Sequence, residues 1–136
     1  MLRYMLDTNF CIATIRDKPG SVRVAFNRHH AQLCVSSVTV MELLYGVELS
    51  AQAQRNLAQV EGFIARLEVL DYDVAAAAHT AQIRAELKTA GMQIGPYDQM
   101  IAGHARSRGL VIVTHNTPEF QRVAGLRIED WLVRTG

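Results

Sequence analysis

The chain has 136 residues, of which 49% are apolar and 20% are charged, and its formal net charge is +1. A chain of this size is expected to bury a core unaided and to fold as a single domain over residues 1–136. The small net charge excludes a strong general attraction for polyanions, so any nucleic-acid interaction must depend on a local site. The apolar runs are shorter than the ~20 residues of a membrane span, and two distant cysteines favour a reducing cytoplasm.

Short apolar runs alternate with helical patterns along the whole chain. In chain order, the predicted elements are a strand at 3–6, helices at 10–16 and 21–30, a strand at 33–36, helices at 37–48 and 52–67, a strand at 68–71, helices at 74–90 and 97–107, a strand at 110–114 and a short strand at 127–128. This alternation predicts an α/β fold with three layers, α/β/α, around a mostly parallel sheet of four to five strands.

Ligands of such sheets bind beyond the carboxyl ends of the strands, where the strand order reverses. Asp7 directly follows the first predicted strand, and Asn116 follows the strand at 110–114. If these two strands are neighbours, the two side chains meet. The helices that begin near Ser37 and Tyr97 then bring Glu42 and Asp98 to the same edge of the sheet.

Each of the three acids also has a purely structural interpretation. Asp7 could cap the following helix, because aspartate is a favoured N-cap residue. Asp98 lies in the first turn of its helix, where the helix dipole favours a negative charge. Glu42 has Val38, Met41 and Tyr45 as helical neighbours, so its burial requires a partner, and an arginine would serve.

Three carboxylates in one pocket repel one another unless a cation neutralises them. A set of oxygen ligands without paired cysteine or histidine favours Mg²⁺ or Mn²⁺ over zinc. Such an ion orients a water molecule as nucleophile and holds a scissile phosphate. Arginines 84, 106, 108, 122 and 127 are candidates for a phosphate-binding rim, whereas the five histidines are expected to be solvated or packed rather than catalytic.

Four motifs occur in a fixed order: Met5–Asn9, Ser36–Leu43 with Gly46, Gly95–Ala102, and Val113–Asn116 with Glu119 and Phe120. Together they resemble the PIN-domain ribonucleases and, more closely, the VapC toxins of type II toxin–antitoxin modules. The likeness extends over the whole chain and ends with residues 128–131.

The resemblance implies a PIN fold and Mg²⁺-dependent endonuclease action on RNA. Asp7, Glu42 and Asp98 match the acidic ligands of the family, and Asn116 stands where many members carry a fourth acid. Its expected role is to orient the substrate or a metal-bound water molecule. The resemblance further assigns four polar groups to support the carboxylates: Thr8, Asn9, Ser37 and Thr114.

The resemblance also implies the partners. Similar VapC proteins cut the anticodon stem-loop of initiator transfer RNA and so stop translation. They form homodimers and are silenced by a VapB antitoxin, which wraps the toxin with its C-terminal segment, binds operator DNA with its N-terminal half and builds a larger assembly. No membrane partner is expected.

Other functions compete with this interpretation. A phosphatase of the haloacid-dehalogenase type needs a second aspartate two positions after the first, and Asn9 stands there. A receiver domain needs a neighbouring acidic pair and a later lysine at a strand end. A catalytically weak PIN module that binds RNA or protein is the non-enzymatic alternative, which the asparagine at position 116 favours and the three acids disfavour.

Overall fold

The computed structural model describes residues 1–16 and 20–131, with the side chains of residues 20–23 left out. Its elements are β1 (Tyr4–Leu6), α1 (Thr8–Arg16), α2 (Gly20–His29), η1 (His30–Gln32), β2 (Leu33–Ser36), α3 (Ser37–Leu49), α4 (Ala53–Ile64), β3 (Glu68–Leu70), α5 (Val74–Ala90), α6 (Pro96–Arg108), β4 (Val111–Val113), α7 (Thr117–Phe120) and β5 (Ile128–Glu129). The alternation predicted from the sequence is confirmed.

The five strands form one parallel sheet in the order β3-β2-β1-β4-β5. β1 is the central strand: Tyr4 pairs with Leu33 of β2 on one side and with Val111 of β4 on the other. The chain therefore builds outward from β1 in one direction and later returns to add β4 in the other. β1 and β4 are neighbours, as expected from the sequence, and the strand order reverses between them.

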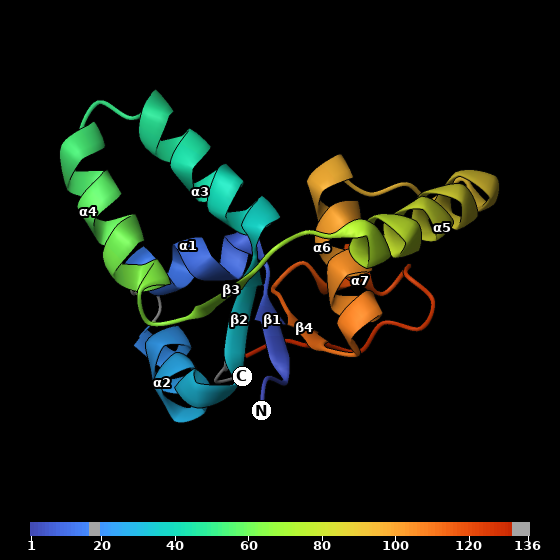
Figure 1. The fold of residues 1–136 in the computed structure, drawn as a ribbon, viewed down its shortest axis with the longest axis horizontal. Helices are drawn as coiled ribbons and strands as arrows, with labels where there is room; N and C mark the ends of the chain where they lie inside the picture. The colour runs from blue at the N-terminus through green and yellow to red at the C-terminus, as the bar shows by residue number, and fades with distance from the viewer. Residues whose placement is uncertain (17–19, 132–136) are drawn as a thin grey trace.

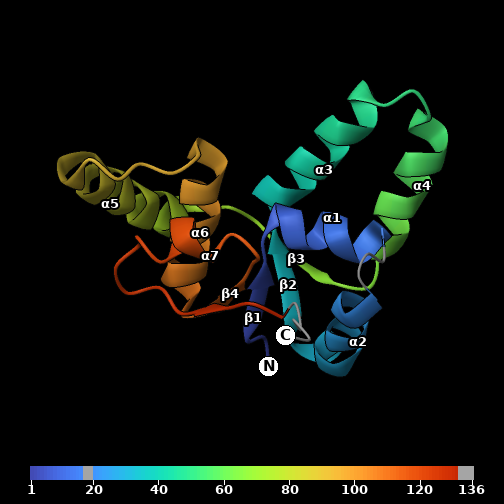
Figure 2. The ribbon, with the colours of Figure 1, turned by 180° about the vertical axis from the view of Figure 1, so that it is seen from behind.

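Helices cover both faces of the sheet, and Figures 1 and 2 show the resulting three layers from opposite sides. α1 to α4 pack on one face, and α5 to α7 lie on the other. The alternation of side chains along each strand divides the core accordingly. Tyr4 and Leu6 point to the first face with Phe10, whereas Met5 points to the second with Ile112.

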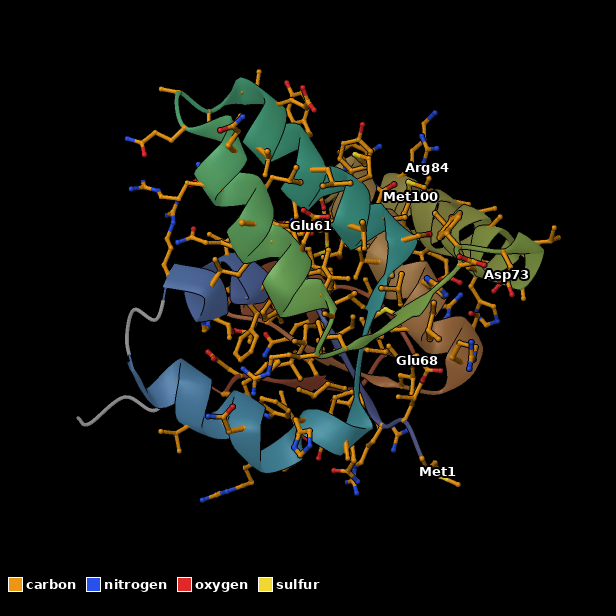
Figure 3. All side chains as sticks on the ribbon, turned by 60° about the vertical axis from the view of Figure 1, so that its left-hand side comes forward. Met1, Glu61, Glu68, Asp73, Arg84 and Met100 are labelled. Carbon is orange, nitrogen blue, oxygen red and sulfur yellow. The ribbon has the colours of Figure 1, made fainter. Side chains whose placement is uncertain are left out.

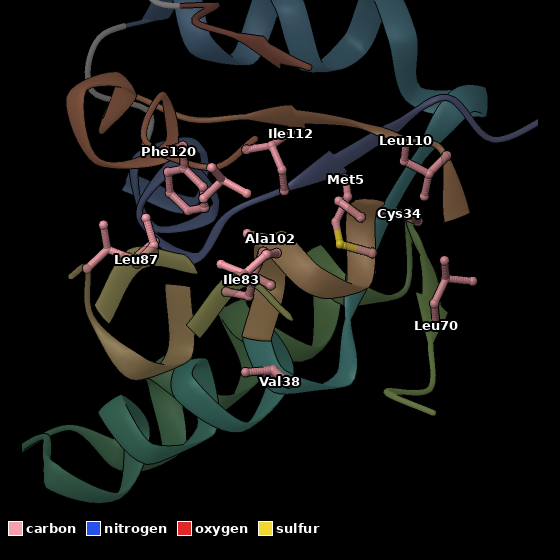
Figure 4. Packing of buried hydrophobic residues seen from close by; sticks show 14 residues of the cluster. Met5, Cys34, Val38, Leu70, Ile83, Leu87, Ala102, Leu110, Ile112 and Phe120 are labelled. Atoms are coloured by element: carbon pink, nitrogen blue, oxygen red, sulfur yellow. The ribbon is translucent and has the colours of Figure 1, made fainter. Parts of the chain in front are cut away.

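The second core is closed by the packing of α5 on α6, and Figure 4 shows it from close by, with Ile83 of α5 near Ala102 of α6. These helices approach so closely because residue 103 is a glycine. A Cβ atom at this position would lie 2.7 Å from the backbone nitrogen of Thr80 and 2.8 Å from its Cα, which is closer than real contacts allow. Gly103 therefore fixes the distance between the two helices.

The chain after β4 differs most from the prediction, because the sequence analysis did not anticipate α7. This helix has only four residues and contains Pro118 in its first turn, so it offers no helical period to detect. Trp131 packs edge-on against Tyr4 and Phe10 and stacks on His29, as expected for an anchor on the core.

Several charged side chains lie on the outside of the molecule, among them Glu61 on α4, Glu68 on β3 and Arg84 on α5 (Figure 3). Cys11 and Cys34 are both buried and not joined in a disulfide. Within the described part of the chain, no helix is long and apolar enough to cross a membrane.

Candidate active site

Asp7 lies at the carboxyl end of the central strand and is 1% exposed. Its Oδ1 accepts a hydrogen bond from the backbone nitrogen of Phe10 at 2.7 Å, so the side chain caps α1 as the structural interpretation predicted. Its Oδ2 accepts a hydrogen bond from the hydroxyl of Thr114, which follows β4. Capping therefore uses one oxygen of Asp7, and the other oxygen connects the ends of the two strands at which the sheet reverses.

Thr114 also organises the loop that follows it. Its hydroxyl oxygen accepts a hydrogen bond from the backbone nitrogen of Asn116 at 2.8 Å, and its own backbone nitrogen donates to the Glu129 carbonyl at 3.0 Å. Asn116 is half-buried at the start of α7. The expected support of Asp7 by Thr114 is thus present, and Asn116 reaches the site through its backbone.

Glu42 reaches the same region from α3. The hydroxyl of Thr8, the residue after Asp7, donates to Glu42 Oε1 at 2.6 Å and lies 3.3 Å from the hydroxyl of Thr39. Within residues 1–16 and 20–131, Glu42 has no ion pair with an arginine. Thr8 therefore takes the supporting position expected of it, and the structural alternative of a salt bridge is not observed in this part of the chain.

Asp98 enters from the first turn of α6, where Gly95 caps the helix and Pro96 begins it. The pKa of Asp98 is raised from 3.8 to about 7, chiefly by burial and then by the negative charges of Asp7, Glu119 and Glu42 and a hydrogen bond with Glu119. Glu119 was not among the residues predicted for the site. It supplies a fourth acid from α7, three positions after Asn116.

The pKa of Asp7 is raised as well. Its pKa is raised to about 6: burial is the largest cause and the charge of Glu42 adds to it, whereas the hydrogen bonds from Thr114 and Phe10 and the charge of His115 limit the rise. The charges of acids on α3 and α7 thus act together with burial to disfavour the ionisation of Asp98, and the charge of Glu42 on α3 also disfavours that of Asp7.

The donor set fits a hard divalent cation, because it consists of carboxylate oxygens whose charges repel. Among the residues that the structure describes, however, no three His, Cys, Asp or Glu side chains already stand in the arrangement of a metal site. The four acids are therefore neighbours that an ion would draw together rather than a preformed cage.

Two of the predicted supporting residues have other surroundings. The hydroxyl of Ser37 accepts a hydrogen bond from the backbone nitrogen of Tyr72 at 3.0 Å and so fastens the start of α3 to the segment after β3. Asn9 is exposed on α1. For Ser37, the expected contact with a carboxylate is replaced by this structural one.

The neighbouring Ser36 has a role that sequence reasoning missed. Its hydroxyl accepts a hydrogen bond from the backbone nitrogen of Val38 at 3.1 Å, which caps α3, and lies 2.8 Å from Nδ1 of His104. His104 is fully buried on α6, and burial lowers its pKa below 6.5. His104 thus connects the helix of Asp98 with the cap of the helix that carries Glu42.

Three of the arginines proposed for a phosphate-binding rim make structural contacts. Arg106 donates to Nδ1 of His79 at 2.9 Å and to the carbonyl of Ala124 at 2.9 Å. Arg122 donates to the carbonyl of Gln93, and Arg127 to that of Gly109. Arg106 also donates to the carbonyl of His79 and to Oε1 of Gln82. The prediction that Arg106 binds phosphate is therefore not supported.

A groove of about 370 Å³ adjoins Glu42 between α1, α3 and α4. It is lined on one side by apolar groups such as Ile12, Leu43 and Val60, and it also contains the basic side chains of Arg16 and Arg55. The groove therefore offers an apolar floor and positive charge next to the acids.

Comparison with known proteins agrees with this geometry. The family model described as the PIN domain matches residues 4–126. The chain is 65% identical to the tRNA(fMet)-specific endonuclease VapC of Shigella flexneri over 96% of this chain and 99% of that protein, and 48% identical to ribonuclease VapC2 of Haemophilus influenzae over 97% and 100%. The crystal structure of DNA-bound VapBC from Salmonella typhimurium superposes with a TM-score of 0.93, with 63% identity over 96% of this chain and 99% of that one. The chain therefore belongs to the PIN-domain family and, within it, to the VapC ribonucleases.

Proposed function

We propose that this VapC ribonuclease cuts RNA by metal-dependent hydrolysis at Asp7, Glu42 and Asp98, with Glu119 as the fourth acid. The observation that carries the proposal is the raised pKa of both Asp7 and Asp98: the two residues lie 91 positions apart in the sequence, and the charge of Asp7 is one of the causes that raise the pKa of Asp98. Mg²⁺ or Mn²⁺, when bound, supplies a Lewis acid that activates water and neutralises the charge of the phosphate.

The chain's own residues prepare this pocket. Phe10 and Thr114 fix the two oxygens of Asp7, and Thr8 fixes Glu42. These donors hold the carboxylates of Asp7 and Glu42 in place before the substrate binds. Asn116, at the start of α7, is assigned to orient the substrate or a water molecule, and Asn9 is assigned to the exposed rim of the site.

We assign initiator transfer RNA as the substrate, because relatives in Shigella flexneri and Salmonella typhimurium are named tRNA(fMet)-specific endonucleases. The family resemblance further assigns the cut to the anticodon stem-loop. The chain thus acts in the cytoplasm, where this RNA is used. One PIN domain over residues 1–136 accounts for the activity. A phosphatase of the haloacid-dehalogenase type is no longer a candidate, because the chain belongs to another family.

We assign the groove beside Glu42 to the C-terminal segment of a VapB-type antitoxin. An apolar floor suits the hydrophobic face of such a segment, and Arg16 and Arg55 suit its acidic groups. A segment seated there covers the acids and blocks RNA. We assign the binding of operator DNA to the antitoxin alone, within a larger toxin–antitoxin assembly; VapBC of Salmonella typhimurium and VapBC2 of Rickettsia felis have both been crystallised with DNA.

The decisive experiment is cleavage of purified transfer RNA with and without divalent ions. We expect cutting with Mg²⁺ or Mn²⁺, none with EDTA, and a loss of at least about 100-fold in Asp7→Asn and Asp98→Asn. Asp71→Asn is the matched control, since Asp71 is exposed outside the pocket. Sequencing of RNA 5′ ends then identifies the cut.

The competing function, a catalytically weak RNA-binding module, is favoured by Asn116 and by the lack of a preformed ion cage among the described residues. It predicts RNA binding that is equally tight with or without metal and no new 5′ ends. Cleavage by the wild type that persists unchanged in Asp7→Asn would contradict both functions as assigned to this pocket.

A further inference from the structure

The loop that carries Thr114 and Asn116 has a second attachment that the proposed mechanism does not use. Nδ1 of His115 lies 3.1 Å from Oδ1 of Asp130, with the two side chains 23% and 26% exposed. Asp130 directly follows β5. The residues that precede this pair, Thr114 and Glu129, are joined by a hydrogen bond of 3.0 Å from the backbone nitrogen of Thr114 to the carbonyl of Glu129. Two consecutive residues thus bind the loop to the end of β5.

His115 also contacts an aromatic side chain of α1. Its ring packs against the ring of Phe10, with centroids 5.4 Å apart and planes inclined by 53°. Phe10 is the residue whose backbone nitrogen holds Oδ1 of Asp7, and Thr114, the neighbour of His115, holds Oδ2. His115 therefore contacts one of the residues that fix the carboxylate of Asp7 and directly follows the other in the chain.

We propose that His115 and Asp130 form a positioning pair that holds residues 114–116 against β5 and thereby fixes the Asp7 carboxylate for catalysis. The pair acts through Asp7 and not on the RNA, because Nε2 of His115 is buried and has no hydrogen-bond partner in the described part of the chain. The proximity is also electrostatic, since the charge of His115 is one of the influences that lower the pKa of Asp7.

The test separates the ring from the hydrogen bond. His115→Phe keeps an aromatic ring against Phe10 and removes the bond to Asp130, whereas His115→Asn removes the ring and retains a donor in a similar place. Asp130→Asn removes the charge of the partner. His30→Phe is the matched control, because His30 is exposed on η1.

For His115→Phe and Asp130→Asn we expect kcat for RNA cleavage to fall about 10- to 100-fold, the range for groups that orient ligands, while KM changes less than about twofold. The loss in the double variant should be smaller than the sum of the two single losses, because both single variants remove the same interaction. His115→Asn should recover part of the loss. Mn²⁺ binding, followed by calorimetry without RNA, should weaken by about tenfold in the same two variants.

The inference rests on the proposed role of Asp7, and the experiment distinguishes the two. If Asp7→Asn cleaves like the wild type, the proposed function fails. If Asp7→Asn is inactive but the folded His115→Phe and Asp130→Asn variants match the wild type in kcat and Mn²⁺ affinity, only the positioning pair is refuted. Losses that add in the double variant, or that affect KM alone, refute it as well. Thermal unfolding of each variant establishes that it is folded.

Discussion

Asp7 illustrates how one side chain serves structure and chemistry together. From the sequence, capping a helix and belonging to an acidic site are alternatives, yet the folded carboxylate does both because its two oxygens have different partners. Capping is also what removes Asp7 from water, and burial is the largest cause of its raised pKa. The structural role thus creates the electrostatic condition that the catalytic role needs.

Removing the hydroxyl that holds Asp7 should affect activity more than stability. Thr114→Val keeps the shape of the side chain, so we expect the free energy of unfolding to fall by about 1–2 kcal/mol and RNA cleavage to fall about 10- to 100-fold. Thr89→Val on the exposed face of α5 is the control. Cleavage rates and thermal unfolding measure both effects; a Thr114→Val enzyme of normal activity would rule out this role.

The raised pKa values also make stability depend on pH. Unfolded aspartates lose their protons near pH 4, whereas folded Asp7 and Asp98 retain theirs until about 6 and about 7. The folded state binds more protons in between, so without divalent ions the free energy of unfolding should fall as pH rises from about 4 to about 7. In Asp98→Asn this fall should be smaller, and its melting temperature at pH 8 should exceed that of the wild type by a few degrees.

Thermal unfolding at several pH values in EDTA tests this prediction. Asp71→Asn should keep the wild-type slope, because Asp71 is exposed. Equal slopes in Asp98→Asn and the wild type would mean that the pKa of Asp98 is not raised in the folded protein. Addition of Mg²⁺ should restore stability above pH 7, where the carboxylates are ionised.

At the scale of elements, the site depends on how two helices are spaced. α6 carries Asp98, and its distance from α5 is set by Gly103 against Thr80. His104, the next residue, connects α6 to the cap of α3 through Ser36. A displacement of α6 therefore moves Asp98 relative to both Asp7 and Glu42.

Two matched glycine substitutions test this spacing. Gly103→Ala should destabilise the protein by about 1–3 kcal/mol, because its methyl group collides with the backbone of Thr80. Gly62→Ala on α4 has open space and should instead stabilise by about 0.5–1 kcal/mol through helix propensity. Urea unfolding measures both. A Gly103→Ala protein as stable as Gly62→Ala would show that the helices can separate without cost.

The elements also show what the sequence can and cannot predict. Apolar runs such as Val111–Val113 identify the strands, and the residue that follows each strand identifies Asp7 and the region of Asn116. Glu119 was missed because α7 is too short for a helical period, and an acid there looks like a first-turn stabiliser. Its signal is the adjacent Phe120, which is fully buried. The contact of His104 with Ser36 spans 68 positions and follows only from the assembled sheet.

At the scale of the whole molecule, one surface is more apolar than a solvated helix requires. Met41, Tyr45 and Leu49 of α3 are exposed, with Tyr45 at 61% and Leu49 at 70%. A second copy of the chain is the partner we assign to this face, in keeping with the homodimer implied by the family resemblance.

Tyr45→Lys should therefore weaken self-association by at least about tenfold, because an interfacial aromatic is replaced by a charge. Sedimentation velocity over a concentration series measures the shift from dimer to monomer. Glu61→Lys on the exposed side of α4 is the control for a change of charge alone. A wild-type protein that is monomeric at high micromolar concentration would contradict the assignment of this face.

The central place of β1 also has a consequence for synthesis. The strand is synthesised before its neighbour β4 at residues 111–113 and before the acid Glu119. A nascent chain that already contains Asp7 and Glu42 therefore lacks a complete cutting centre. Cleavage of RNA by the growing chain has to wait until synthesis has passed residue 119.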